Sequence, residues 1–461
     1  MFERPRSGER ALLVRLALGA APDPDDIREF TQLAESAGAS VVHTITGSRS
    51  KPDSKFFVGS GKAEEIREQA QLHTADLILV DHPLSPSQER NLEKLIGKRV
   101  LDRNGLILDI FAQRAASHEG KLEVELAQLK HMSSRLVRGW THLDRQRGGG
   151  IGLRGPGETE LETDRRLLGT KVKYLTQKLA KLKQQRATGR SGRASIPVPA
   201  LALVGYTNAG KSTLFRALTG ADAYVANQLF ATLDPTVRRL QLRGGVQVVV
   251  ADTVGFIRDL PHELVAAFQS TLQEAREANV LLHVIDSSDT RRDEQMDQVN
   301  AVLSDIGAGE IPQIRVYNKI DRLQTQPRIE RDLDGTAIAV WISAEQGMGL
   351  DLLQEAISER ISRSVNRINL RLPVLAGATR AQLYRAGVVV AERTSEEGFD
   401  LTVDLPAVEL AALERQEGVV ISKPGAEVLD SARANAPCAP RGRYLKSAAR
   451  PRAPVAGKRA S

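Results

Sequence analysis

Apolar runs and amphipathic stretches alternate along the first 117 residues of the chain. Four short apolar runs predict strands at 11–18, 40–46, 77–80 and 99–101. Stretches with helical spacing of apolar residues predict helices at 25–37, 63–72 and 87–96. Strands that alternate with helices are typical of a parallel sheet, so residues 1–117 are predicted to form a small α/β domain.

Residues 118–188 change to the period of long amphipathic helices. One apolar stripe consists of Leu122, Leu126, Leu129, Leu136, Trp140 and Leu143. A second stripe consists of Leu161, Leu168, Val172, Leu175, Leu179 and Leu182. Two such helices can bury their stripes against each other, which predicts an antiparallel helical hairpin.

The connector between these helices, residues 145–157, holds six glycines and three arginines and has no acidic residue. Helix–helix connections usually take about two to eight residues, so this one is too long for a bare turn. Glycine-rich backbone can approach a surface closely, and arginine binds phosphate with two hydrogen bonds. We therefore interpret the connector as an RNA contact rather than a plain loop. The candidate RNA-binding residues are Arg145, Arg147, Gly149, Arg154 and Gly155.

The remainder of the chain divides by composition. Residues 189–197, rich in Gly, Ser and Arg, are expected to be a linker, and 198–365 show the apolar runs of a second, larger α/β domain with a mostly parallel sheet. In 366–428 the alternation of Phe399, Leu401, Val403 and Leu405 predicts a half-buried strand, with a short helix at 407–415. This region is expected to be a small α/β domain, and 429–461 a disordered basic tail.

Composition narrows the class of protein. The net charge of +7 is concentrated in residues 118–190, with sixteen Lys and Arg against eight Asp and Glu, and in residues 431–461, with eight Lys and Arg and no acid. This distribution favours a large anionic partner, although the tail alone can equally serve solubility. The single cysteine, Cys438, indicates a reducing compartment, and no run reaches the roughly 18 apolar residues of a membrane helix. We expect a cytoplasmic monomer without a membrane span.

The most informative stretch is Gly205–Ser212, which follows the apolar run 200–204. Its pattern of Gly, four residues, Gly-Lys-Ser defines a phosphate-binding loop. A buried strand ends, two glycines let several N–H groups face one point, and a helix begins near Lys211 with its positive end toward that point. Lys211 is expected to reach the β- and γ-phosphates, and the Ser212 hydroxyl to bind Mg²⁺.

Three further strand ends make the nucleotide assignment specific. Asp252-Thr-Val-Gly255 follows one apolar run, Asn318-Lys-Ile-Asp321 follows the next, and Ser343-Ala344 follows a third. The Asp321 carboxylate can accept hydrogen bonds from N1–H and the amine of guanine, a donor pair that adenine lacks. These motifs predict a GTP site at the carboxyl ends of the strands.

A switch segment is expected between the first helix and Asp252, at Phe230–Thr236. Thr232 is the candidate to place its hydroxyl on Mg²⁺ when the γ-phosphate is present. The predicted catalytic residues are Lys211, Thr232 and Gly255, and the predicted metal ligands are Ser212 and Thr232. The predicted nucleotide-binding residues are Gly205, Tyr206, Thr207, Asn208, Ala209, Gly210, Lys211, Ser212, Phe230, Ala231, Thr232, Leu233, Asp234, Asp252, Thr253, Val254, Gly255, Asn318, Lys319, Ile320, Asp321, Ser343, Ala344 and Glu345.

With these motifs the chain resembles the HflX family of translation-associated GTPases. The resemblance spans roughly residues 40–425 and is most specific at Gly155–Arg166, a glycine-proline segment before an acidic and basic helix. It implies binding to the large ribosomal subunit, with the hairpin reaching ribosomal RNA near the peptidyl-transferase centre. It also implies splitting of stalled or idle ribosomes during stress. The basic extension past 430 is not part of the shared pattern.

Two residues bear on the rate of hydrolysis. Phe256 follows Gly255 where many GTPases carry the Gln that orients the attacking water, so slow intrinsic hydrolysis is expected until a ribosomal subunit orders the switch loops. Asn208 resembles the asparagine of potassium-activated GTPases, which makes K⁺ a second candidate cofactor.

Two other functions stay open from the sequence. One is a large-subunit assembly factor in which GTP only times release. The other is an RNA-remodelling nucleotidase that uses the N-terminal half, because Gly59-Ser-Gly-Lys62 resembles a second phosphate loop. It lacks the four-residue spacer and the Ser or Thr after Lys, so a plain turn is the favoured interpretation.

Overall fold

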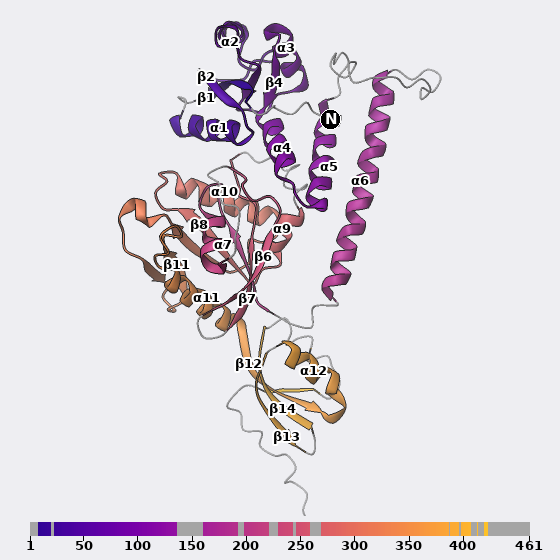
Figure 1. Ribbon diagram of the computed structural model, residues 1–461, viewed down its shortest axis with the longest axis vertical. Coiled ribbons are helices and arrows are strands. Elements are labelled where there is room, and N and C mark those ends of the chain that lie inside the picture. The colour runs from indigo at the N-terminus through magenta and orange to yellow at the C-terminus, as the bar shows by residue number, and fades with distance from the viewer. Residues whose placement is uncertain are drawn as a thin grey trace, which may run out of the picture.

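The structure is a computed structural model with three sheets that follow one another along its longest axis (Figure 1). It describes residues 8–19, 23–135, 160–191, 198–220, 229–242, 246–258, 269–386, 388–395, 398–406, 413 and 419–422. In that part of the chain, no helix is both long enough and apolar enough to cross a membrane.

The N-terminal unit contains a four-stranded parallel sheet in the order β2-β1-β3-β4. Its strands are β1 (Arg10–Leu18), β2 (Ser40–Arg49), β3 (Leu77–Val80) and β4 (Arg99–Asp102). Its helices are α1 (Pro24–Ser36), α2 (Ser60–Leu72), α3 (Pro86–Ile96) and α4 (Arg103–Arg114). The predicted parallel α/β arrangement is confirmed.

Both faces of this sheet are buried because successive side chains of a strand point to opposite sides. In β1, Leu12 and Val14 pack with residues of α2 and α3, whereas Ala11 and Leu13 pack with residues of α1 and α4. Asp23 accepts a 2.9 Å hydrogen bond from Asp25 N and Pro24 occupies the first turn, so α1 begins where the sequence indicates.

Helix α4 was not expected from the sequence. Its residues 106–108, 110 and 111 are all buried apolar side chains, so the stretch lacks the polar face that reveals an amphipathic helix. The Asp102 side chain accepts a 2.8 Å hydrogen bond from Gly105 N and caps this helix directly after β4.

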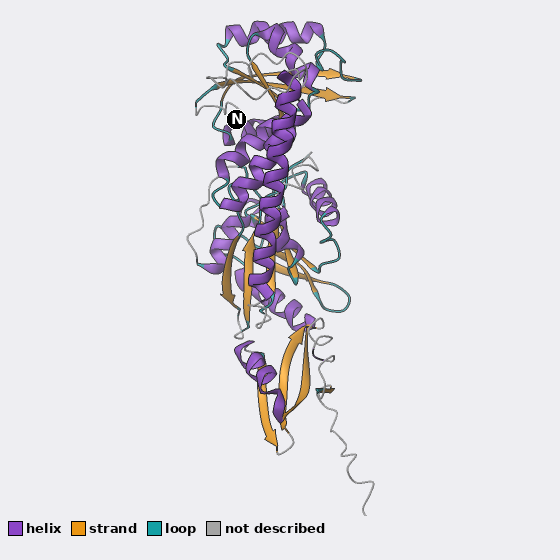
Figure 2. Cartoon of the chain, turned by 90° about the vertical axis from the view of Figure 1, so that its right-hand side faces the viewer, coloured by secondary structure: helices purple, strands orange, loops and turns teal. Residues whose placement is uncertain are grey.

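The helical hairpin is formed by α5 (His118–Arg135) and α6 (Glu160–Ser191). Leu122, Leu126 and Leu129 pack against Leu175 and Leu179, as the two stripes predict. Helix α6 spans about 48 Å at 1.5 Å per residue and runs past both the N-terminal and the central sheets (Figures 1 and 2). The stripe residues Leu136, Trp140 and Leu143 lie outside the described residues.

The central unit holds a seven-stranded sheet in the order β10-β11-β9-β8-β5-β7-β6, in which only the edge strands β10 and β6 are antiparallel to their neighbours. Its strands are β5 (Ala200–Val204), β6 (Thr236–Gln241), β7 (Gln247–Asp252), β8 (Val280–Asp286), β9 (Gln313–Asn318), β10 (Arg328–Arg331) and β11 (Ala337–Trp341). Its helices are α7 (Lys211–Thr219), α9 (Gln269–Arg276), α10 (Arg292–Asp305), the short η2 (Ile320–Leu323) and α11 (Leu350–Ser364). Residues of α7 and α11 share one core cluster, and residues of α9 and α10 belong to another.

The C-terminal unit is an antiparallel sheet in the order β13-β14-β12-β15, with one described α-helix packed on it. Its elements are β12 (Val365–Pro373), η3 (Val374–Ala376), α12 (Gly377–Ala386), β13 (Val389–Ser395), β14 (Gly398–Pro406) and β15 (Val420–Ser422). The predicted strand at 399–405 is β14, whose Leu401 and Val403 are buried. The predicted helix at 407–415 and the tail at 429–461 fall almost wholly outside the described residues.

Candidate functional site

The phosphate loop joins the end of β5 to the start of α7. Gly205 and Gly210 have φ of 147° and 96°, values that favour glycine. A Cβ atom at Gly205 would lie 2.2 Å from the carbonyl oxygen of Val284, and one at Gly210 would lie 2.3 Å from Nδ2 of Asn318. The loop therefore needs both glycines for its conformation and for its close contact with β8 and β9.

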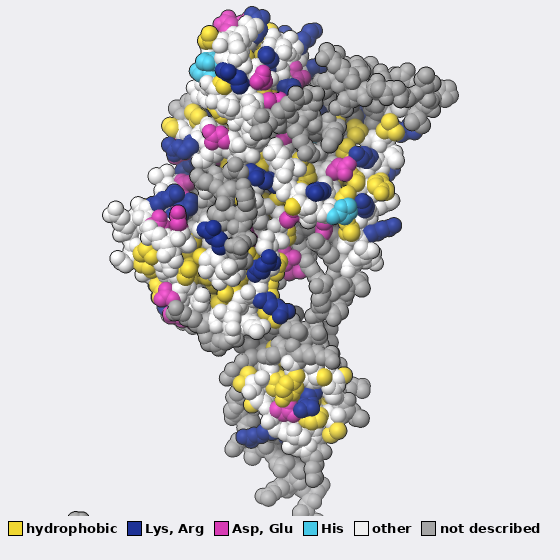
Figure 3. Space-filling view, in the orientation of Figure 1, with side chains coloured by type: hydrophobic (Ala, Val, Ile, Leu, Met, Phe, Trp, Pro, Cys, Tyr) yellow, Lys and Arg dark blue, Asp and Glu magenta, His cyan; other side chains and the backbone are white. Residues whose placement is uncertain are grey.

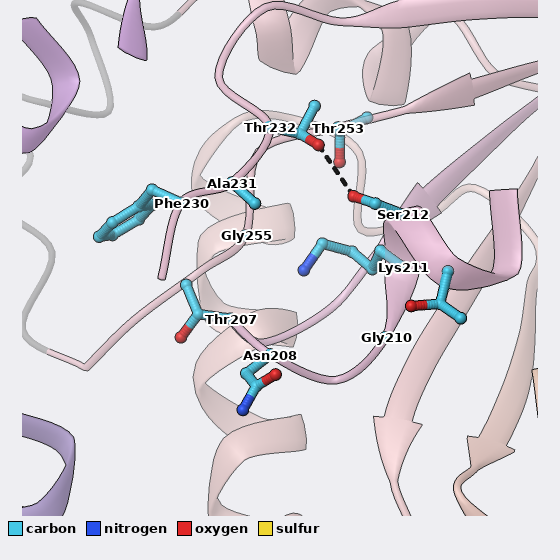
Figure 4. A pocket seen from close by; sticks show the side chains of 11 residues that line it. Thr207, Asn208, Gly210, Lys211, Ser212, Phe230, Ala231, Thr232, Thr253 and Gly255 are labelled. Carbon is cyan, nitrogen blue, oxygen red and sulfur yellow. Dashed lines mark hydrogen bonds between the residues drawn. The ribbon is translucent and has the colours of Figure 1, made fainter. Parts of the chain in front are cut away.

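Lys211 is buried within this loop. Its Nζ donates hydrogen bonds to the carbonyl oxygens of Gly205 (3.0 Å) and Tyr206 (2.7 Å), so the side chain lies back along the loop (Figure 4). Burial lowers the pKa of Lys211 to about 8, although the charge of Asp252 opposes that shift. Phosphate oxygens next to this amine would supply the negative charge that it lacks.

Three oxygen-bearing side chains converge beside Lys211. Ser212 Oγ lies 2.8 Å from Thr232 Oγ1, and Asp252 Oδ2 accepts hydrogen bonds from Ser212 (2.7 Å) and Thr232 (2.9 Å). The other oxygen, Asp252 Oδ1, is buried and has no hydrogen-bond partner in the described part of the chain. Two hydroxyls and a carboxylate are the hard oxygen ligands that Mg²⁺ prefers, and the unpartnered oxygen fits a further ligand or metal-bound water.

The loops after β9 and β11 meet at the far end of the phosphate loop. Asn318 donates to the carbonyl oxygen of Ala209 (3.0 Å) and accepts from Ala344 N (2.9 Å). Lys319 Nζ donates to the carbonyl oxygen of Asn208 (2.6 Å) and to Asp286 (2.7 Å). Asn318 and Lys319 thus fix the positions of three loops relative to one another.

Asp321 follows in η2. Its Oδ1 atom is buried and accepts no hydrogen bond from any described residue. A buried carboxylate oxygen without a donor is costly unless a ligand supplies one. The N1–H and amine of guanine are such donors, so the arrangement is suited to guanine.

The pocket in Figure 4 collects most of the predicted phosphate-binding residues. It is lined by Thr207, Asn208, Gly210, Lys211, Ser212, Thr213, Phe230, Ala231, Thr232, Thr253 and Gly255. Thr213 was missed by sequence reasoning, although its place directly after the Gly-Lys-Ser motif is a signal for it. Asp286 was also missed, and its position at the end of the apolar strand β8 is the corresponding signal.

Three family models match the chain. One described as GTP-binding GTPase N-terminal covers residues 24–112, one described as GTP-binding GTPase Middle Region covers 114–193, and one described as 50S ribosome-binding GTPase covers 200–319. The GTPase HflX of Escherichia coli (strain K12) is 52% identical over 423 residues, 91% of this chain and 99% of that protein. The chain belongs to the HflX family of GTPases. It is a GTP hydrolase with a phosphate-loop GTPase domain.

A second relative agrees with this family. The GTPase HflX of Caldanaerobacter subterraneus subsp. tengcongensis is 44% identical over 405 residues, 88% of this chain and 93% of that protein. Among solved structures, a GTP-binding protein from Sulfolobus solfataricus in complex with GDP is 24% identical, with a TM-score of 0.42. That comparison covers 77% of this chain and 99% of the other.

Several predicted site residues of this HflX-family chain turn their side chains away from the pocket. The Tyr206 hydroxyl donates to Glu29 of α1 instead. Thr253 contributes to the lining of the pocket, but its hydroxyl donates to the carbonyl oxygen of Leu203 (2.6 Å). Leu233 and Val254 are buried in the core. In the loop after β11, Ser343 is buried whereas Glu345 is exposed.

Phe256 lies in the core rather than in the nucleotide pocket, with only 1% of its surface exposed. Its backbone pairs with the phosphate loop, because Phe256 N donates to Gly205 O (3.1 Å) and Thr207 N donates to Phe256 O (2.7 Å). The Phe256 side chain therefore contributes to packing.

The second glycine motif, Gly59–Lys62, forms the start of α2. A Cβ atom at Gly59 would lie 1.8 Å from Arg49 Nη1, so a side chain already fills the space beside the turn. Lys62 Nζ donates to the carbonyl oxygen of Thr46 (3.2 Å) and pairs with Glu65 (2.8 Å). These contacts favour the plain turn.

A network of ion pairs joins α1 and α4 to the central unit. Arg103, 1% exposed, donates to Glu29 (2.6 Å) and to the carbonyl oxygen of Arg258 (3.1 Å). Asp26 accepts hydrogen bonds from Arg258 and, at 2.7 Å, from Arg291. Although burial opposes it, the neighbouring arginines lower the pKa of Asp26. No sequence motif predicted this network.

The five candidate RNA-binding residues lie outside the described residues. They are Arg145, Arg147, Gly149, Arg154 and Gly155.

Proposed function

We propose that this protein binds the large ribosomal subunit and hydrolyses GTP there, and that it splits stalled or idle ribosomes in the cytoplasm under stress. The match of residues 200–319 to a family described as 50S ribosome-binding GTPase is the observation that carries the proposal. The glycine- and arginine-rich connector at 145–157 supports it, because such a segment can approach ribosomal RNA closely.

The hairpin next to the connector is also basic on its outer side. Arg165, Arg166, Lys171 and Lys173 of α6 are exposed, and Figure 3 shows Lys and Arg side chains over this part of the surface. Positive side chains on a long projecting element suit contact with an RNA backbone.

The chemistry of hydrolysis is assigned to residues of the phosphate loop and the switch segment. Lys211 would neutralise charge on the β- and γ-phosphates, and the Gly255 N–H would donate to the γ-phosphate. Ser212 and Thr232 would hold Mg²⁺, with Asp252 beside them. Bound Mg²⁺ supplies charge stabilisation to the transferred phosphoryl group. Asn318, Lys319 and Asp321 would hold the guanine base.

Slow hydrolysis by the isolated protein is part of this proposal. Phe256 cannot orient a water molecule, and a ribosomal subunit that orders the switch segment would raise the rate. Asn208 makes K⁺ a second proposed cofactor, and equal turnover in NaCl and KCl would exclude a role for it.

The proposal also includes the division of the chain into domains. We assign an N-terminal α/β domain to 1–117, a helical hairpin to 118–188, a GTPase domain to 198–365 and a C-terminal α/β domain to 366–428. A monomer is the proposed form of the free protein.

The test is GTP hydrolysis by the purified protein, alone and with large or small ribosomal subunits. Large subunits alone are expected to raise the rate by about tenfold or more, and Lys211→Ala is the control for contaminating nucleotidases. If neither subunit changes the rate, the assignment of the large ribosomal subunit as the partner is wrong. Sedimentation of the ribosomal particles from cells that lack the protein distinguishes the splitting function from the assembly function. A failed assembly step would accumulate precursor subunits. ATP turnover that survives Lys211→Ala would favour the N-terminal nucleotidase instead.

A further inference from the structure

The switch segment, residues 230–236, packs against the N-terminal unit. Phe230 meets Phe111 of α4 edge to face, with ring centroids 4.6 Å apart. The preceding Leu229 N donates a 2.9 Å hydrogen bond to Ser36 Oγ at the end of α1. Leu229, Phe230 and Leu233 are each at most 3% exposed. The segment is therefore fixed by contacts outside the central unit as well as within it.

Asp234 joins this segment to the start of α5. Its Oδ2 atom accepts hydrogen bonds from Ala116 N (2.7 Å) and Ser117 N (2.8 Å), and its Oδ1 atom accepts one from the Ser117 hydroxyl. Ser117 Oγ in turn accepts from Gly120 N (2.9 Å). A carboxylate at a helix N-terminus is also favoured by the helix dipole. Asp234 and Ser117 together cap α5.

The fit between Asp234 and α5 is tight. A Cβ atom at Gly120 would lie 2.5 Å from Asp234 Oδ1. Any side chain at position 120 would therefore push the carboxylate away from the helix. Gly169 of α6, by contrast, has nothing within 4 Å of a Cβ atom and offers a matched control.

Asp234 is also tied to the nucleotide site through the chain itself. Thr232, two residues earlier, bonds to Ser212 and Asp252 at the predicted Mg²⁺ position. Leu233 between them is buried, and Pro235 restricts the backbone of Asp234 to extended conformations. Thr232 and Asp234 therefore have little freedom to move independently.

The opposite end of α5 is attached to the N-terminal unit. Arg135 donates to Asp102 (2.5 Å) and to the carbonyl oxygen of Leu84 (3.2 Å), and it also pairs with Glu89. Between its two ends α5 spans about 27 Å at 1.5 Å per residue. The helix thus runs from the switch segment to the contacts of Arg135 with the N-terminal unit.

We propose that Asp234 is a positioning residue for GTP hydrolysis, which holds Thr232 in place by capping α5 and couples the nucleotide state to that helix. Contacts of Thr232 that depend on the γ-phosphate would strengthen the Asp234 cap. Such coupling is reciprocal. A partner that stabilises the capped form of α5 would therefore also stabilise Thr232 in its position beside Ser212 and Asp252, by the same coupling free energy.

The kinetic test uses variants on both sides of the contact in the full-length protein. Asp234→Ala removes three hydrogen bonds, and Gly120→Ala displaces the carboxylate without changing it. Each is expected to lower the single-turnover rate of GTP hydrolysis about tenfold, whereas GDP affinity should change less than about twofold. Asp234→Asn keeps one acceptor oxygen for the N–H groups of Ala116 and Ser117 and should retain a rate closer to that of the unchanged protein.

Two controls account for general effects on folding. Gly169→Ala makes the same substitution in an open helical position. Asp332→Ala removes another carboxylate that accepts two backbone N–H bonds, in the β10–β11 turn. Both should keep wild-type rates. If Asp234→Ala does not fold, as judged by its circular dichroism melt, Gly120→Ala and Asp234→Asn carry the test.

Hydrogen exchange of amides 118–121 tests the coupling directly. If Asp234 had a purely structural role, the exchange rate of these amides would not depend on the nucleotide. In the unchanged protein these amides should exchange more slowly with a non-hydrolysable GTP analogue than with GDP. That difference should disappear in Asp234→Ala and Gly120→Ala and persist in both controls. An unchanged rate in these two variants, or no dependence of exchange on the nucleotide in wild type, would overturn the proposal.

Discussion

The Tyr206 hydroxyl donates a 2.5 Å hydrogen bond to the carboxylate of Glu29, across 177 positions of the sequence. The same oxygen accepts a 2.8 Å hydrogen bond from Arg258 N. Burial and the charge of Glu29 raise the pKa of Tyr206, so the hydroxyl stays protonated and remains a donor. One side chain thereby joins the phosphate loop, the segment after Gly255 and helix α1.

Removal of this hydroxyl should destabilise the protein. In Tyr206→Phe, Glu29 Oε2 loses its donor in a buried position, and we expect the free energy of unfolding to fall by about 1–3 kcal/mol. Urea unfolding of the full chain measures the change. Tyr174→Phe on α6 is the control, because Tyr174 is 61% exposed. Equal effects of the two substitutions would show that the buried hydrogen bond adds no stability.

The local motifs of the nucleotide site could be predicted from the sequence, because each lies within a few residues at a strand end. The contacts of Tyr206 with Glu29 and of Asp234 with Ser117 could not, since their partners are more than a hundred positions away. Helix α4 was missed because it is buried on most sides. Its apolar residues therefore do not recur with the helical spacing that reveals an amphipathic helix. Local pattern thus located the chemistry, whereas the contacts that support it required the tertiary structure.

The carboxylate of Asp321 should determine the choice of base. In Asp321→Asn, an amide N–H replaces an acceptor opposite the guanine amine, and affinity for GTP should fall roughly a hundredfold or more. Affinity for xanthosine triphosphate should rise. Xanthine has a carbonyl where guanine has the amine, and this carbonyl can accept a hydrogen bond from the side-chain amide of the Asp321→Asn variant. Fluorescent-nucleotide titration measures both affinities, with Asp334→Asn as an exposed control. An unaltered preference for GTP would place guanine recognition elsewhere.

Substitution of Phe256 by Gln should not create a fast GTPase. The side chain is buried in the core, so a glutamine there would not reach a water in the pocket. The substitution should instead lower the free energy of unfolding by about 2–4 kcal/mol, since it buries an amide and loses apolar contacts. Phe256→Leu should lower the free energy of unfolding by less than Phe256→Gln does. Faster turnover by Phe256→Gln than by wild type would mean that this position can face the attacking water.

Stability should decrease in acid partly because of His283 in β8. Burial lowers the pKa of this 2% exposed imidazole to about 4, whereas its ordinary value is 6.5. The unfolded chain therefore takes up the proton first, and stability that is complete above pH 6.5 is lost as the pH falls toward 4. The loss amounts to at most about 3 kcal/mol.

The variant His283→Leu isolates this contribution. Its free energy of unfolding, measured in urea at pH 7, 5.5 and 4.5, should fall less than that of wild type over the same interval. Identical pH dependence of the two proteins would assign the acid sensitivity to other groups.

One buried cluster contains Phe30, Leu33 and Phe111 of the N-terminal unit together with Phe230 and Ile257 of the central unit. During synthesis the first three emerge well before the last two. At about 5–20 residues per second, the ribosome needs roughly 6–24 s to extend the chain from Phe111 to Phe230. During that interval the part of the α4 surface that Phe230 covers in the folded protein lacks this cover, and transiently exposed apolar surface makes a nascent chain prone to aggregation until the switch segment arrives.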